Sequence, residues 1–202
     1  MFLFLSIACA EKKTTQIPTV SAPKDSLTFA LKLSQAALSL TEALVTYDGT
    51  YFTIPYPNGD VPADKGVCTD VIIRAYRKLG IDLQQRVHDD MAANFALYPQ
   101  KWGLKKTDTN IDHRRVPNLM TFFSRHGEVK KLSQNPQDFQ PGDIVTWNLT
   151  GNLTHIGLIV NFLSEDKKRY LVVHNIGNGQ ELADCLFQYE MTGHYVYSLQ
   201  KR

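Results

Sequence analysis

The chain has 202 residues, and its 22 Lys and Arg against 20 Asp and Glu give a formal net charge of +2. This balance argues against a protein that binds nucleic acid through counterion release. With 43% hydrophobic and 21% charged residues, the chain can bury a core, which excludes a disordered protein. No apolar run approaches the ~20 residues that a membrane-spanning helix needs. The three cysteines are too few for a disulfide framework.

The first ten residues, MFLFLSIACA, look like a targeting segment. They resemble the end of a secretory leader with a lipoprotein-type cleavage site, in which Ser6-Ile7-Ala8 precede a lipidated Cys9. The segment has no basic region and its apolar stretch is short, so the alternative is a buried apolar strand with an inert thiol. We expect an exported protein of the periplasm or cell envelope, anchored to a membrane surface through Cys9. Residues 1–25 would be leader and tether, and residues 26–202 a single domain.

The first half of that domain favours helices. Good helix formers dominate residues 26–47, and no proline interrupts them. Gly80 suits a helix C-cap, Pro99 a helix stop and Pro117 a first helical turn. The expected helices are residues 26–47, 66–79, 87–98 and about 117–124, separated by a Pro- and Gly-rich loop at 48–65 and an irregular polar segment at 100–115.

The second half changes to apolar and β-branched runs of strand length, bounded by turn residues. A Pro-Gly-Asp turn precedes the first run, and the charged stretch SEDKK predicts a hairpin between two others. The expected strands are residues 144–147, 155–163, 169–174 and 194–199. Helices first and antiparallel strands second predict an α+β fold, with helices packed on one face of a meandering sheet.

Cys68 is the first candidate for chemistry, because it lies in the first turn of the helix predicted for 66–79. Unpaired backbone N–H groups and the positive end of the helix dipole stabilise a thiolate there. We therefore expect the pKa of Cys68 to fall below the ordinary value of roughly 8.5. The same N–H groups could hold an oxyanion. The alternative is an inert cysteine buried in the core.

His155 and His174 are the second candidate, since they lie on consecutive predicted strands joined by a hairpin. Neighbouring antiparallel strands lie ~4.8 Å apart, so one imidazole could orient the other as in a catalytic triad. The alternative is a pair of structural histidines. Structural zinc sites usually need four ligands in close pairs, which this sequence lacks, so we expect no metal and no cofactor.

The motifs around these three residues resemble a known family. GVCTDVIIRAYRKLG is similar to the nucleophile helix of the NlpC/P60 cysteine peptidases of the papain-like superfamily. PGDIVTWN, THIGLIV and LVVHN are similar to that family's consecutive strands. The resemblance implies an NlpC/P60-type fold, with Cys68 as nucleophile, His155 as general base and His174 as the orienting residue.

The stretch 45–199 is more closely similar to the DUF1287 (YijF-like) family, an uncharacterised bacterial group. The run VCTDVIIRAYRKLGIDLQQRVHDDM carries most of this likeness. Two departures from NlpC/P60 stand out. The usual Asp-Cys-Ser-Gly is replaced by Val67-Cys68-Thr69-Asp70, so the acid follows the cysteine, and residues 81–140 have no counterpart in the minimal core. We expect that insertion to cover or border the cleft.

Further residues are candidates for binding substrate. Asn175 could replace His174 as the orienting group, but side chains alternate along a strand, so only one of the two can face Cys68. Asp70 could hold a substrate amine, although capping the helix is the better interpretation. Tyr51 resembles an aromatic of the family's substrate groove, or packs within its loop. Arg114 and Arg115 could bind a substrate carboxylate, or lie in a solvated turn. Cys185 is expected to be buried and unpaired.

Three functions fit these residues. The first is an exported cysteine hydrolase of amide bonds in peptidoglycan stem peptides, which would act through an acyl-enzyme on Cys68. The second keeps the same thioester but transfers acyl or lipid groups. The third is a non-catalytic module that binds the cell wall or another ligand. The sequence carries no indication of oligomeric state.

Overall fold

The computed structural model describes residues 24–199, apart from the side chains of 24–27 and 152. The expected leader, its Cys9 and most of the tether lie outside these residues. Within them the chain forms four α-helices and a six-stranded antiparallel sheet, so the α+β prediction is confirmed. None of the helices described is both long and apolar enough to cross a membrane.

The helices fall near their predicted positions, with different ends. The bounds are α1 Lys24–Leu38, α2 Cys68–Lys78, α3 Leu83–Ala93 and α4 Val116–His126. Gly80 follows α2 at a positive φ of 76°, as its assignment as a C-cap requires. The prediction of a helix over 87–98 has the wrong bounds. The carboxylate of Asp82 accepts the N–H of Gln85 and starts the helix earlier.

The first helix is shorter than predicted. After α1, a short 3-10 turn covers Ser39–Glu42 and Ala43 becomes extended. Strand β1 (Thr46–Tyr47) then pairs in parallel with β2 (Lys65–Gly66), which brings the loop ahead of α2 beside the end of the first helical segment. This long-range pairing overrides the helical propensity of residues 43–47, as tertiary context often does.

The main sheet has the strand order β3-β8-β4-β5-β6-β7. The strands are β3 Glu128–Val129, β4 Ile144–Asn148, β5 Thr154–Leu163, β6 Tyr170–His174, β7 Glu181–Ala183 and β8 Glu190–Val196. The two edge strands β3 and β7 are not among the predicted strands, because they are too short to show a period. Strand β8 begins earlier than the predicted 194–199, because its first residues are polar.

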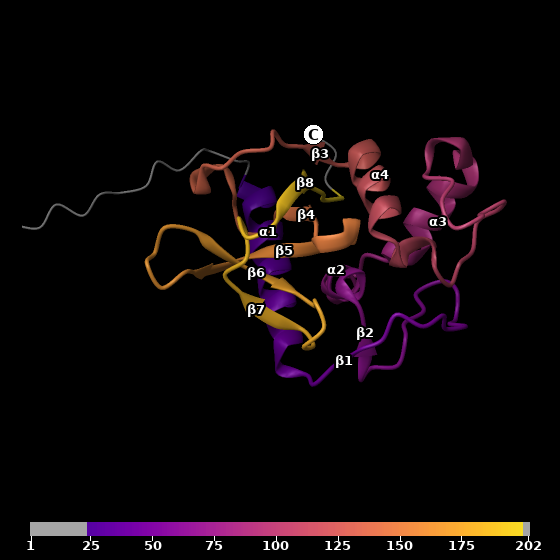
Figure 1. Cartoon of the computed structure of the whole chain (residues 1–202), viewed down its shortest axis with the longest axis horizontal. Coiled ribbons are helices and arrows are strands. Elements are labelled where there is room, and N and C mark those ends of the chain that lie inside the picture. Colours follow the sequence, from indigo (N-terminus) through magenta and orange to yellow (C-terminus); the bar gives the residue numbers. More distant parts are fainter. Residues whose placement is uncertain (1–23, 200–202) are drawn as a thin grey trace, which may run out of the picture.

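Each face of the sheet carries its own apolar layer. Helices α1 and α2 contact β5 and each other (Figure 1), and residues such as Ile156 and Leu158 pack beneath them with Cys68. On the opposite face Trp147 and Cys185 belong to a second, smaller cluster. Successive side chains on a strand point to opposite faces, so residues of the two layers alternate along β4, β5 and β6.

Gly157 tests this two-layer packing. A Cβ there would lie 2.5 Å from Cγ1 of Val172 and 3.2 Å from the Trp147 ring. Neither buried side chain can move freely, so Gly157→Ala should destabilise the protein by about 1–3 kcal/mol. Gly49→Ala, whose Cβ would meet only Val67 at 4.0 Å, should change stability by less than about 0.5 kcal/mol. Urea unfolding followed by circular dichroism measures both, and equal stabilities would contradict the packing described.

Candidate active site

Cys68 occupies the first position of α2, as the sequence predicts. The preceding Val67 is extended and serves as the N-cap, and its N–H donates to the carboxylate of Asp70 at 2.7 Å. This reciprocal bond satisfies one of the donors that a helix start would leave unpaired. Capping by Asp70 is confirmed, and it fixes the direction in which the Cys68 side chain leaves the helix.

The sulfur of Cys68 is surrounded by backbone donors. The N–H groups of Ile156, Thr69 and Cys68 itself form hydrogen bonds that lower the pKa of the thiol. Burial acts more strongly in the other direction, since the residue is only 6% exposed. Together with the nearby charge of Asp70, burial raises the pKa of Cys68 to about 12. The expected depression of this pKa is therefore wrong, because desolvation outweighs the helix terminus.

His155 and His174 lie together, as their strands predict. Nε2 of His155 is 2.8 Å from Nδ1 of His174, and the two rings meet edge to face. Burial lowers the pKa of His155 to about 3, with a further contribution from His174, and lowers the pKa of His174 to about 4. Both rings are therefore neutral near pH 7, and the contact is a hydrogen bond between two neutral imidazoles.

The sheet separates the imidazole pair from the cysteine side chain. His155 is directly opposite Trp147 in the β4–β5 register and stacks on its ring, so it points away from the layer that holds Cys68. Within residues 24–199, no hydrogen bond or ion pair links Cys68 to His155. The two are connected instead through Ile156, whose N–H bonds the sulfur directly after His155 in the chain.

Asn175 takes the position nearer to Cys68. Its side-chain amide donates to the carbonyl of Gly66 at 3.2 Å and its oxygen accepts the N–H of Gly177. His174, one residue earlier, points to the other face and contacts His155. The expected alternation is confirmed, but the residue on the Cys68 side is Asn175, where it holds the strand that leads into α2.

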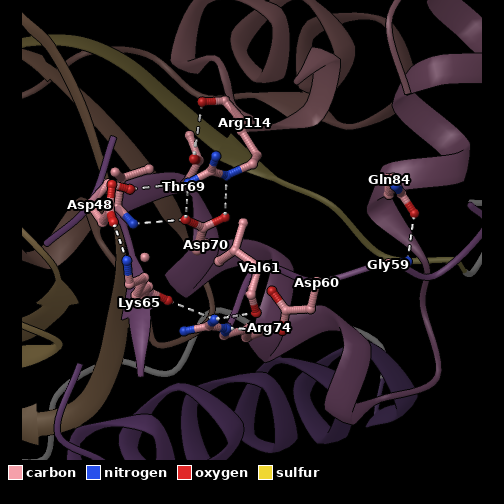
Figure 2. Close-up of polar contacts among 12 residues, drawn as sticks. Asp48, Gly59, Asp60, Val61, Lys65, Thr69, Asp70, Arg74, Gln84 and Arg114 are labelled. Atoms are coloured by element: carbon pink, nitrogen blue, oxygen red, sulfur yellow. Dashed lines mark hydrogen bonds and ion pairs between the residues drawn. The ribbon is translucent and has the colours of Figure 1, made fainter. Parts of the chain in front are cut away.

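Asp70 and Arg114 form a buried ion pair (Figure 2). The guanidinium of Arg114 donates to both carboxylate oxygens of Asp70 at 3.0 Å, and it also reaches the carbonyls of Thr50 and Asp48. The hydroxyl of Thr69 also donates to the backbone carbonyl of Arg114. The expectation that Arg114 binds a substrate carboxylate is corrected, because its donors are engaged inside the protein.

The remaining predicted binding residues lie elsewhere. The hydroxyl of Tyr51 bonds to Asp108 and Asn110, and the residue is exposed. Arg115 stacks over the ring of Trp102, 4.2 Å from its centroid. Both contacts tie these side chains to the 102–110 segment of the predicted insertion, and neither involves Cys68 or the imidazole pair.

Sequence reasoning missed three residues that the tertiary structure brings to the site. Tyr47 pairs with Gly66 across β1 and β2, and its pKa is raised by burial and by electrostatic interaction with nearby Cys68 and Asp70. Cys185 lies 3.7 Å from Nε2 of His174, and Glu181 lies 3.8 Å from the same atom. Strand β7, which holds Glu181 and leads into the loop with Cys185, carries no sequence signal of its own. Within residues 24–199, no group of three or more His, Cys, Asp or Glu is arranged to hold a metal ion.

Comparison with known proteins gives a family but no activity. The model of the family described as "Domain of unknown function (DUF1287)" matches residues 34–197. The "Uncharacterized protein YijF" of Escherichia coli (strain K12) is 51% identical over 167 residues, which cover 83% of this chain and 81% of that protein. The matched region includes every residue of the site described above.

The buried ion pair predicts a large stability loss from a small change. Asp70→Asn keeps an acceptor for the helix cap but leaves the Arg114 charge buried without its partner, so it should cost about 3–5 kcal/mol. Asp166→Asn, which breaks an exposed pair with Arg169, should cost about 1 kcal/mol or less. Urea unfolding at pH 7 compares them. Equal losses would mean that Arg114 is not buried as described.

The neutral histidines predict that stability falls on mild acidification. His113, His155 and His174 have lowered pKa values in the folded state, mainly through burial, so below pH ~6.5 the unfolded chain binds protons that the folded chain refuses. Each should contribute up to about 1.4 kcal/mol per pH unit. His113→Gln should therefore reduce the difference in urea stability between pH 7 and pH 5, and an unchanged difference would contradict the buried neutral ring.

Proposed function

The chain belongs to the DUF1287 family, whose function is unknown, and we propose that it is a cysteine hydrolase that cleaves amide bonds. The observation that carries the proposal is the position of Ile156. Its N–H bonds the sulfur of Cys68 while its neighbour His155 bonds His174. The thiol and the imidazole pair are thus next to consecutive residues of β5, and a cysteine at a helix start and an oriented imidazole are the groups that thiol-dependent catalysis uses.

The proposed reaction begins with proton transfer from Cys68 to His155. Nε2 of His155 is occupied by His174, so Nδ1 takes the proton. The thiolate attacks the amide carbon, and the N–H groups of Cys68 and Thr69 stabilise the oxyanion. The C–N bond breaks, the amine leaves with the proton from His155, and a thioester remains on Cys68. A water then gives a proton to His155 and attacks the thioester. The C–S bond breaks, the acid is released, and the proton returns to the sulfur.

This reaction requires the closed site to open. Cys68 is buried with a high pKa, and no hydrogen bond joins it to His155 among the described residues. Catalytic hydrogen bonds often tighten only when substrate is bound. Because His155 and Cys68 lie on opposite faces of β5, the proposal requires the backbone at the start of β5 to shift so that Nδ1 of His155 reaches the sulfur. Tyr47, which is 45% exposed and interacts electrostatically with Cys68, marks the surface at which substrate would enter.

Peptidoglycan stem peptides are the proposed substrate. The support is the resemblance of the Cys68, His155 and His174 motifs to the NlpC/P60 peptidases, together with the lipoprotein-type segment around Cys9. On this proposal the fold is of the papain-like type, and Cys9 anchors an exported enzyme beside the cell wall. The insertion at 81–140 would border the cleft, since its 108–110 segment binds the loop that leads into β2.

Loss of each proposed catalytic residue should affect turnover differently. Cys68→Ala and His155→Ala should lower hydrolysis about a thousandfold or more, and His174→Ala should leave about 1–10% of it, since orienting groups are less essential. Purified stem peptides incubated with the full chain and analysed by mass spectrometry give the rates. His126→Gln is the matched control, because its side chain is 40% exposed, pairs with Asp90 and packs on the ring of Phe122, away from Cys68 and the imidazole pair.

Several outcomes would reject the proposal. Full activity of Cys68→Ala would exclude Cys68 as the nucleophile. If Cys185→Ala were then inactive, the nucleophile would be the thiol that lies 3.7 Å from His174. A thioester that passes its acyl group to an added amine, without release of acid, would identify an acyl transferase instead.

A further inference from the structure

His174 has polar neighbours on both of its ring nitrogens. Nδ1 faces Nε2 of His155 at 2.8 Å. Nε2 faces an oxygen of Glu181 at 3.8 Å and the sulfur of Cys185 at 3.7 Å. Glu181 is directly opposite His174 in the β6–β7 ladder, so the sheet register holds the carboxylate in place. The protons of an imidazole are set by the partners of its two nitrogens.

We propose that Glu181 is a positioning residue that fixes the order of protons along the imidazole pair, so that Nδ1 of His155 is left free to act as the base. The inference rests on the proposed function for its catalytic meaning. The proton order itself is a property of the folded protein and is measurable without substrate.

The argument starts from the neutrality of both rings. Burial lowers the pKa of His155 to about 3 and of His174 to about 4, so each ring carries one N–H near pH 7. A carboxylate can only accept a hydrogen bond. At 3.8 Å the two groups are beyond hydrogen-bond distance, so the carboxylate acts through its charge. It favours the tautomer whose Nε2–H faces Glu181, and Nδ1 of His174 then accepts from Nε2–H of His155. The reverse order would point a nitrogen lone pair at the carboxylate.

Cys185 does not determine the order of protons on the two rings. The residue is 3% exposed, and burial, with the charges of Asp184 and Glu181, raises the pKa of its thiol to about 12. It is therefore a neutral thiol that can accept or donate only weakly. The groups that face His174 are thus His155 from β5, Glu181 from β7 and Cys185 from the following loop, and Glu181 supplies the only negative charge among them.

The consequence for catalysis is direct. With the proposed order, Nδ1 of His155 has a lone pair and can take the proton of Cys68. With the reverse order, Nδ1 carries a proton and cannot. The Glu181 charge also favours the imidazolium that forms during proton transfer, because it lies beside the second ring.

The test is the tautomer of each ring in the Glu181→Gln variant. Full-length protein labelled with ¹⁵N-histidine at pH 7 gives two-bond ¹H–¹⁵N spectra that distinguish Nδ1–H from Nε2–H. The wild type should show Nε2–H on both His155 and His174. Glutamine has the same shape but can donate to Nε2 of His174, so both rings should change to Nδ1–H. Glu165→Gln, in the exposed β5–β6 hairpin loop, should leave the spectrum unchanged.

Turnover provides a second, separate readout. Glu181→Gln should lower kcat at least tenfold with little change in KM, and Glu165→Gln should lower neither. Nδ1–H on His155 in the wild type, or unchanged tautomers in Glu181→Gln, would overturn the inference. The predicted tautomer change in a protein whose wild type cleaves no peptide would support the proton order and reject the proposed function.

Discussion

The rest of the site depends on the hydrogen bonds that the buried Asp70 carboxylate accepts. It accepts the N–H of Val67 and so starts α2 at Cys68, and it holds the guanidinium of Arg114 with both oxygens. Arg114 in turn binds the carbonyls of Asp48 and Thr50. One buried charge thereby joins helix α2, the loop before it and the segment ahead of α4. The acid that follows Cys68 in the sequence therefore has a structural role here.

The sheet adds a second constraint, because alternation along its strands decides which side chains can meet. Ile156 faces the helices, and His155 faces Trp147 on the other side. In β6 the same rule sends His174 toward His155 and leaves Asn175 bonded to Gly66. The thiol and the imidazoles are thus held by neighbouring backbone positions rather than by direct contact. The buried thiol stays protonated near pH 7.

The polar residues beside His174 determine the direction of proton transfer in the proposed chemistry. Glu181 and Cys185 meet His174 on the side opposite to His155. A carboxylate at one end of two neutral imidazoles makes their two proton orders unequal. The favoured order leaves a base at the other end, where β5 meets the helix start. The same arrangement explains why β7, a short edge strand with partly buried residues, belongs to the site.

The sequence by itself determined the parts of this protein that depend on local chemistry. Apolar periodicity and turn residues predicted the α+β order, Cys68 was placed at a helix start, and two strand-borne histidines were expected to meet. Only the tertiary structure decided what depends on distant neighbours. Pairing of β1 with β2 ends α1 early and places Tyr47 near Cys68. Asp70 binds Arg114, and the register of β7 places Glu181 opposite His174. The pKa of Cys68 belongs to this second group, because burial, which no motif records, outweighs the helix terminus that the motif predicts.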